Sequence, residues 1–233
     1  MRNIFSVPDE GVFQGKSNDN IELLKAWAGT TLAYAILISR GDFLSFIFVI
    51  NLLISGIVCG LAFVFHELAH RIVARRFGAE AHFVANNGWL LISIVVAFAG
   101  FFIAAPGAVW HRGYLTERQG GLIALAGPAT NLVFALLFLL ALPILSFTDL
   151  ATTSTTIAGV HLYSLAFLLC SIGYSLNAFI GLFNMIPAGP FDGAKVLAWS
   201  PLYFGITVAI GILLTFVLKP ELVWRFLGSP IPF

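Results

Sequence analysis

Apolar residues in this chain gather in long runs, separated by short stretches that hold charges, glycines or prolines. A helix that crosses a bilayer needs about 20 predominantly apolar residues. Several runs come close to this length or exceed it, and we expect each to form a transmembrane helix: 21–39, 43–65, 121–147, 157–183 and 201–218. The polar connections between them leave no room for a separate soluble domain.

One further apolar run, 89–110, has glycine and proline residues inside it and basic residues on both sides. Basic flanks favour the cytoplasmic face, and a segment with both ends on one face must enter the membrane and return. We expect a re-entrant hairpin, helical over 90–97 and extended over 100–110, with a straight crossing as the alternative. Extended backbone at membrane depth is tolerated only against protein or a water-filled cavity. The predicted fold is therefore an all-α polytopic membrane protein with five to six transmembrane helices and a re-entrant β-hairpin near the active site.

The composition supports the prediction of a polytopic membrane protein. Hydrophobic residues make up 59% of the chain and charged residues 10%, with a mean hydropathy of +0.96, which is unlike a water-soluble domain of this size. The formal net charge of +1 gives no reason to expect a nucleic-acid partner. We expect a cytoplasmic arm over 1–20, a single transmembrane domain over 21–218 with its core at about 45–197, and an interfacial tail over 219–233.

Three arginines follow the second apolar run, at positions 71, 75 and 76. By the positive-inside rule they place that end of the run, and the N-terminus with it, in the cytoplasm. We therefore expect a multi-pass protein with its active site toward the cytoplasmic side. A compact chain without sorting segments favours a prokaryotic cell membrane.

The same end of the run carries the sequence His66-Glu67-Leu68-Ala69-His70. Residues four apart lie on one face of a helix, so His66 and His70 can direct imidazole nitrogens at one zinc ion. Glu67 lies about 100° round the helix, where it could accept a proton from a metal-bound water. The alternative is a structural histidine pair near the interface. The remaining histidines are expected in solvent or at the interface: 82, 111 and 161.

A second polar stretch follows the fourth predicted crossing, from Asn184 to Gly193, and it contains two prolines and two glycines. Proline removes a backbone donor and disfavours helix in the residue before it, so the chain must unwind here. A catalytic zinc needs a third protein ligand, and Asp192 is the candidate. The competing interpretation makes Asp192 the N-cap of a helix that begins at Gly193. Asn131, inside the third crossing, is a further polar candidate whose alternative role is helix packing.

Together these residues resemble the site-2 protease family of intramembrane zinc metalloproteases, which pairs H-E-x-x-H with a later N-x-x-P-x-x-x-x-D-G. The second motif corresponds to Asn184, Pro187, Asp192 and Gly193, and the helix with Gly127-Pro128-x-x-Asn131 is similar to the family's middle segment.

The resemblance implies that one zinc ion is held by His66, His70 and Asp192, and that Glu67 activates the attacking water. It also implies that Asn184 helps to position the substrate or the oxyanion, and Asn131 is a second candidate for substrate binding. The implied partners are a transmembrane protein substrate and the bilayer, and we expect no nucleic acid and no nucleotide. The chain has no room for a PDZ insertion or a nucleotide-sensing tail.

The expected activity is hydrolysis of a peptide bond within or near a transmembrane segment. Two other functions fit buried His, Glu and Asp residues: a membrane cation transporter, and a catalytically silent relative that binds membrane partners. A transporter would move metal across liposome membranes without needing Glu67 as a base. No ligand or base position of the motifs is missing, which argues against the silent relative.

Overall fold

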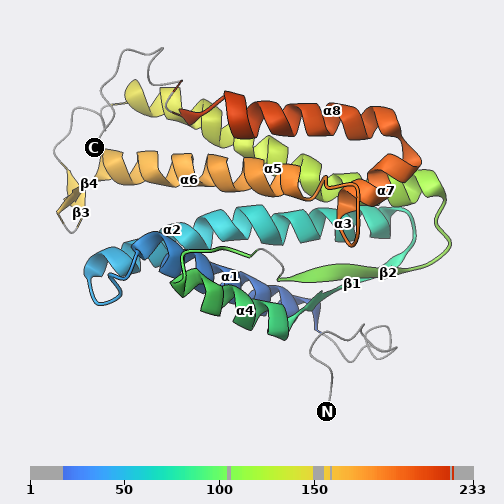
Figure 1. Ribbon diagram of the computed structural model, residues 1–233, viewed down its shortest axis with the longest axis horizontal. Helices are drawn as coiled ribbons and strands as arrows, with labels where there is room; N and C mark the ends of the chain where they lie inside the picture. The colour runs from blue at the N-terminus through green and yellow to red at the C-terminus, as the bar shows by residue number, and fades with distance from the viewer. Residues whose placement is uncertain (1–17, 104–105, 149–154, 158, 221, 223–233) are drawn as a thin grey trace. The chain divides into compact units, whose positions relative to one another are not determined.

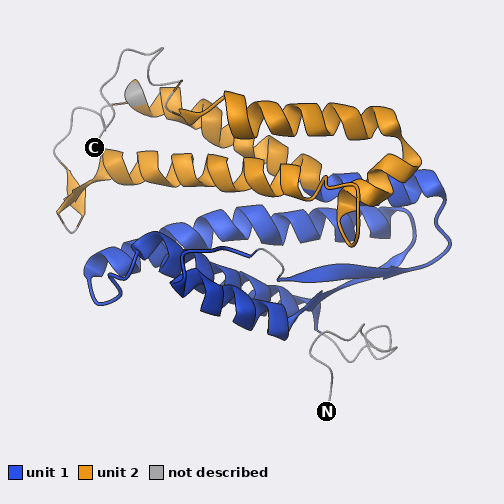
Figure 2. Cartoon of the chain, viewed as in Figure 1, with its two compact units in different colours: residues 1–127 blue, residues 128–233 orange. Residues whose placement is uncertain are grey.

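The computed structural model describes residues 18–103, 106–148, 155–157, 159–220 and 222 (Figure 1). The predicted arm over 1–20 and the tail over 219–233 therefore fall largely outside the described residues. The chain packs as two compact units, residues 1–127 and residues 128–233 (Figure 2).

The first unit is built mainly of helices, with bounds α1 (Asp19–Ser39), α2 (Phe46–Cys59), η2 (Gly60–Val64), α3 (Phe65–Arg76) and α4 (Asn87–Phe98). α1 begins where the side chain of Asn18 accepts a hydrogen bond from the backbone N–H of Asn20. It ends at Ser39, and the left-handed backbone of its C-cap, Arg40 (φ 47°), turns the chain toward α2. α2 and α4 both pack against α1 (Figure 1).

α2 and α3 form one continuous helical segment, Phe46–Arg76, with the π-helical turn η2 between them. A π turn inserts one residue into the helix and rotates everything beyond it. Before this turn, Trp27 of α1 donates its indole N–H to the carbonyl of Gly56 on α2 at 2.7 Å. The polar end of the segment, which carries both histidines of the first motif, lies beyond the turn.

A two-stranded antiparallel sheet completes this unit. β1 (Glu80–Ala85) pairs with β2 (Gly107–Arg112), and the register runs from Glu80 opposite Arg112 to Ala85 opposite Gly107. The side chains of Ala81, Phe83 and Ala85 are buried, in the alternation expected of a strand with one covered face.

The second unit takes the larger part of α5 (Glu117–Ser146), which begins in the first unit. Its other elements are β3 (Thr156–Ile157), β4 (Val160–His161), α6 (Leu162–Phe183), α7 (Asp192–Trp199), α8 (Pro201–Ile212) and η4 (Leu213–Val217). α8 packs against α6, and α5, α6 and η4 share a core of apolar side chains.

The helical character predicted from the sequence is confirmed, although the small sheets add β structure to an all-α expectation. In the part of the chain that the structure describes, four helical segments are long and apolar enough to cross a membrane: Asp19–Ser39, Phe46–Arg76, Glu117–Leu145 and Leu162–Phe183. They correspond to the first four predicted crossings. Asn87–Phe98 and Pro201–Val217 are shorter apolar helices, so five to six crossings remain a prediction.

The run over 89–110 is a helix followed by a strand, as predicted, but the strand is shorter and its partner was missed. The helix extends over Asn87–Phe98 instead of 90–97, and strand pairing starts only at Gly107. The pairing partner is β1, which lies before the helix and which the sequence analysis left unassigned. Whether the segment enters the membrane and returns stays a prediction.

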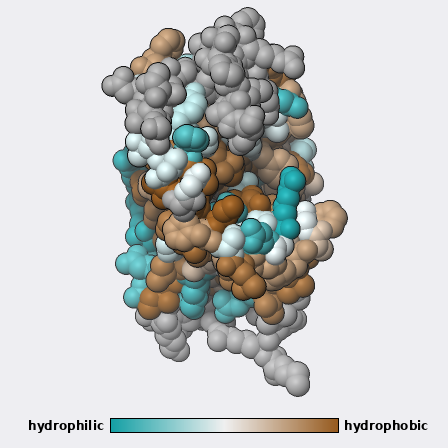
Figure 3. Space-filling model, turned by 90° about the vertical axis from the view of Figure 1, so that its left-hand side faces the viewer, coloured by the Kyte–Doolittle hydropathy of each residue, from teal (hydrophilic) through white to brown (hydrophobic). Residues whose placement is uncertain are grey.

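Apolar side chains reach the surface on the long helices of both units. Leu53 on α2 is 65% exposed and Leu140 on α5 is 60% exposed. Figure 3 shows one face on which apolar side chains lie at the surface among polar ones. Exposed leucines along helices of this length are what a lipid environment requires.

Candidate metal centre

His66 and His70 lie one turn apart on α3 and are both buried, at 4% and 7% exposed. Their Nε2 atoms are 3.0 Å apart, with the rings nearly perpendicular. Two nitrogens bound to one tetrahedral zinc at about 2.0–2.1 Å would be separated by about 3.3 Å. The predicted convergence is therefore present in the first unit, and the two imidazoles fit a shared metal ion.

A backbone carbonyl fixes the second ring. His70 Nδ1 lies 2.6 Å from the carbonyl oxygen of Ile123 on α5, so Nδ1 carries the proton and donates it. This leaves the Nε2 lone pair of His70 available for a metal. Hydrogen bonds of this kind orient metal-binding histidines and set their tautomer. Sequence reasoning missed Ile123 because a main-chain carbonyl leaves no mark in the side-chain pattern.

Glu67 follows His66 on α3 and is half-buried. On the helix it lies about 100° from each neighbouring residue, beside the face that carries the two histidines. A carboxylate there is suited to take up a proton from a water on that face.

Asp192 belongs to the second unit and is 8% exposed. It is the first residue of α7, and Phe191 is the N-cap, without a side-chain capping bond. The alternative in which Asp192 caps a helix beginning at Gly193 is therefore wrong. A carboxylate in the first turn also gains from the helix dipole, which stabilises its charged form.

The chain before α7 folds back tightly on itself. The N–H of Gly193 donates to the carbonyl of Asn184 at 2.8 Å. A Cβ at Gly193 would lie 2.7 Å from the carbonyl oxygen of Ile186 and closer still to the carbonyl of Met185. Only glycine allows this approach, and the approach sets where the first turn of α7 begins.

Asn184 and Asn131 both lie in the second unit. Asn184 ends α6, and its Nδ2 donates to the carbonyl of Ile180 at 3.0 Å. Asn131 is fully buried on α5 and donates from Nδ2 to Oδ1 of Asn177 on α6 at 3.1 Å. This bond matches the helix-packing role that the sequence left open for Asn131. The substrate-binding role of both residues stays a prediction.

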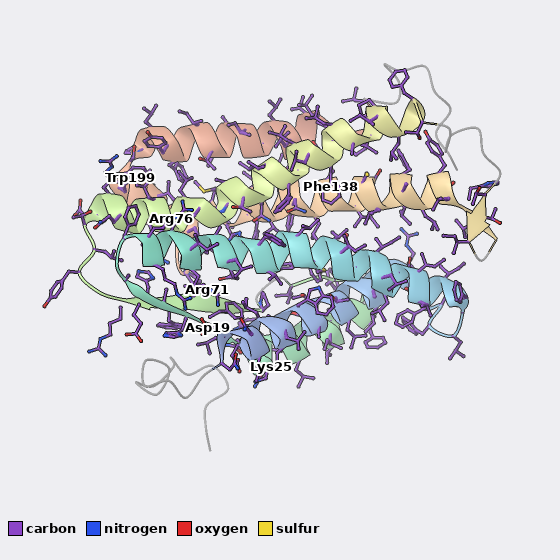
Figure 4. The ribbon with its side chains drawn as sticks, turned by 180° about the vertical axis from the view of Figure 1, so that it is seen from behind. Asp19, Lys25, Arg71, Arg76, Phe138 and Trp199 are labelled. Carbon is purple, nitrogen blue, oxygen red and sulfur yellow. The ribbon has the colours of Figure 1, made fainter. Side chains whose placement is uncertain are left out.

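A cluster of charged side chains fastens α1 to α3 and β1 in the first unit (Figure 4). Asp19 Oδ2 accepts from Arg71 at 2.9 Å and from Arg75 at 3.0 Å, and Asp19 Oδ1 lies 2.9 Å from His82 Nδ1. His82 was expected in solvent. It instead lies 20% exposed against two carboxylates, those of Asp19 and Glu80.

Side chains of α1 and α3 also form hydrogen bonds with the outer edge of β1. Arg75 donates to the carbonyl of Ala81 at 2.6 Å, and the N–H of Ala85 donates to Glu22 at 3.1 Å. In an antiparallel pair, every second residue directs its N–H and C=O away from the partner strand. Ala81 and Ala85 are such residues of β1, so side chains of α1 and α3 already bind this edge.

Comparison with known proteins identifies similar sequences among zinc metalloproteases. The model of peptidase family M50 matches residues 53–200, which include both motifs. "Putative zinc metalloprotease MJ0611" of Methanocaldococcus jannaschii is 38% identical over 180 residues, covering 76% of this chain and 84% of the relative. "Putative zinc metalloprotease YwhC" of Bacillus subtilis is 29% identical over 148 residues, covering 59% and 64%. "Putative zinc metalloprotease Rip3" of Mycobacterium tuberculosis is 30% identical over 132 residues, covering 57% of this chain and 27% of the relative.

No solved structure matches this chain. The buried histidine pair of H-E-x-x-H, the family match and the similarity to proteins named "Putative zinc metalloprotease" indicate a metallopeptidase. The chain belongs to peptidase family M50, the site-2 proteases.

Proposed function

We propose that this protein is an intramembrane zinc metalloprotease, which hydrolyses a peptide bond within or near a transmembrane segment of a membrane-protein substrate. The observation that carries the proposal is the buried pair of His66 and His70, whose Nε2 atoms are 3.0 Å apart at the end of a 31-residue apolar helical segment. Ionisable residues in such segments are costly and are kept for function.

We assign three ligands to the single zinc ion: His66, His70 and Asp192. Two imidazoles and a carboxylate form a donor set typical of catalytic zinc, with a fourth position left for water. The support for Asp192 is its burial and its tightly held position at the start of α7, together with the family motif that contains it.

Bound zinc would acidify a water ligand and polarise the scissile carbonyl. The protein's own part of the reaction then falls to four groups. Glu67 takes the proton of the attacking water and passes it to the leaving amine. The carbonyl of Ile123 accepts a hydrogen bond from His70 Nδ1 and so orients the ring with Nε2 available as a metal ligand. Asn184, and secondarily Asn131, are proposed to position the substrate.

A transmembrane helix must unwind before it is cut, because its carbonyls are otherwise hydrogen-bonded and shielded. We propose that the unwound segment adds to the β1–β2 sheet as a further strand. Since side chains of α1 and α3 occupy the outer edge of β1, the added strand would pair with β2, whose outward-directed residues include Gly107 and Val109. Phe102, which lies within the predicted hairpin, packs its ring against Tyr34 and is not part of the strand.

The proposed localisation is a prokaryotic cell membrane, with the catalytic end of α3 toward the cytoplasm. The observation behind the orientation is the arginine group at that end of α3, which the positive-inside rule assigns to the cytoplasm.

The test uses purified protein in detergent, a membrane-spanning peptide substrate and a metal assay. Wild type should bind about one zinc and cleave the peptide, and a chelator should abolish cleavage until zinc is restored. Glu67→Gln should keep zinc and lose cleavage, while His66→Ala and Asp192→Asn should lose zinc. His161→Ala, at the exposed end of β4, is the matched control and should keep both.

Cleavage by Glu67→Gln would refute the protease mechanism and favour the transporter, which a metal-flux assay in liposomes would then examine. Wild type that binds zinc but cleaves no peptide would favour the silent relative. Full zinc and full activity in Asp192→Asn would show that the third ligand lies elsewhere.

A further inference from the structure

Gly127 on α5 faces both histidine rings of the first unit. A Cβ built on this glycine would lie 2.5 Å from His66 Nε2 and 2.6 Å from His66 Cε1, and closer still to His70 Nε2. Side-chain carbons essentially never approach another heavy atom within 3.0 Å. No side chain therefore fits at position 127 while the two rings keep their places.

The space that this Cβ would fill has a particular location. It is close to both Nε2 atoms at once, at distances a little longer than the Zn–N bond of about 2.0–2.1 Å. The two nitrogens are 3.0 Å apart and each can direct a lone pair toward this space. A cation bound by both imidazoles would have to occupy it.

The same face of α5 also orients the ring of His70 through a hydrogen bond. Ile123 and Gly127 are four residues apart and thus lie one above the other along the helix. The carbonyl of Ile123 accepts from His70 Nδ1 at 2.6 Å, and the bare Cα of Gly127 faces the opposite nitrogen of that ring. One turn of α5 thus orients the ligand and leaves room for the ion.

We propose that Gly127 is a positioning residue: because it has no side chain, it leaves open the space in which the catalytic metal binds. The proposal rests on the proposed zinc-dependent function, and it adds a residue that contributes no ligand atom. A glycine inside a helix costs about 1 kcal/mol relative to alanine. Helix stability alone would therefore favour alanine at 127, and the space beside the rings gives the reason for glycine.

The experiment replaces Gly127 with alanine and compares it with Gly120→Ala. Gly120 lies in the same helix, and a Cβ there would meet nothing within 4 Å. Both variants are purified in detergent, and bound zinc per chain is measured after dialysis against a fixed zinc concentration. Cobalt is then substituted for zinc, and its visible absorption reports the ligand geometry without any need for activity.

Gly127→Ala is expected to lower zinc affinity at least about tenfold and to change or abolish the cobalt spectrum, while Gly120→Ala matches wild type. Wild-type zinc content and cobalt spectrum in Gly127→Ala would overturn the proposal. Wild type that binds no zinc would instead overturn the proposed function, so the two failures are distinguishable.

A second experiment tests folding by placing Gly127→Ala in a chain that already carries His66→Ala and His70→Ala. In that background the rings are gone, so alanine at 127 should leave thermal unfolding unchanged or raise its midpoint. A triple variant that fails to fold would show that the glycine serves close packing against other groups, and it would overturn the proposal.

Discussion

Asp19 is expected to contribute more to stability than any exposed ion pair at the same end of α1. Its carboxylate binds Arg71 at 2.9 Å, and the two side chains are only 12% and 15% exposed. Its second pair, with Arg75, involves an arginine side chain that is 48% exposed. Asp19→Asn keeps an acceptor oxygen but removes the charge, and it leaves Arg71 without its carboxylate.

The expected loss follows from these exposures. A charge-assisted hydrogen bond in a mostly buried place contributes about 1.5–3 kcal/mol. The exposed Arg75 contact adds about 0–1 kcal/mol. Because asparagine can still accept one bond, we expect Asp19→Asn to lower the free energy of unfolding by about 2 kcal/mol. For a chain of this size that corresponds to a fall of about 4–8 °C in the thermal midpoint.

The assay is thermal unfolding of the purified protein in one detergent, with Lys25→Gln as the matched control. Lys25 pairs with Glu22 on the same helix at 2.6 Å, but its side chain is 46% exposed. Such a pair contributes about 0.2–0.5 kcal/mol. Equal midpoints for Asp19→Asn and Lys25→Gln would refute the reasoning. So would a difference that disappears in high salt, since salt screens exposed pairs far more than buried ones.

Two further predictions concern close packing in the second unit. Gly193→Ala should lower zinc content, because its Cβ would press on the carbonyls before α7 and displace Asp192; Gly205→Ala, whose Cβ meets nothing within 4 Å, should leave zinc unchanged in the same metal assay. Asn177→Leu should lower the free energy of unfolding by about 1–3 kcal/mol, because it removes the acceptor of the Nδ2 group of fully buried Asn131. Thermal unfolding measures the second effect, and an unchanged midpoint would contradict it.

The long helices were predictable because lipid and length impose a simple pattern. The first predicted crossing, 21–39, differs from α1 by two residues at its start, and the third, 121–147, lies almost entirely within α5. The convergence of His66 and His70 was also predictable, because helical spacing alone places them on one face. These features depend only on contacts close in sequence.

The strand β1 was missed for the opposite reason. Its buried positions are Ala81, Phe83 and Ala85, and alanine gives a weak apolar signal in a six-residue segment. Its partner β2 begins 22 residues after β1 ends. Nothing local distinguishes such a strand from a polar loop, and it is defined by the pairing and by the side chains of Arg75 and Glu22 that bind its edge.

Pro128 shows a second limit of local reasoning. Glycine and proline, as at 127 and 128, commonly bend or end a helix, yet α5 runs from Glu117 to Ser146 with Pro128 inside it. Proline costs about 3 kcal/mol or more in a helix interior in water, because it removes a donor and clashes with the preceding turn. In transmembrane helices, neighbouring groups can satisfy the freed carbonyl, so the penalty does not end the helix.

A motif search finds residues whose side chains bind a metal. The space for the metal and its ligands also depends on residues without a side chain, which such a search does not single out. Gly127 leaves a gap beside two imidazole nitrogens, and Gly193 lets the chain close on the carbonyl of Met185 just after Asp192. In the sequence both look like ordinary helix breakers, and both lie inside helices. At both positions a Cβ would clash with other atoms: at 127 with the proposed histidine ligands, and at 193, next to Asp192, with the carbonyls before α7. Only the three-dimensional structure reveals this clash. Substituting these two glycines therefore tests the candidate site independently of its ligands, since every coordinating atom remains in the chain.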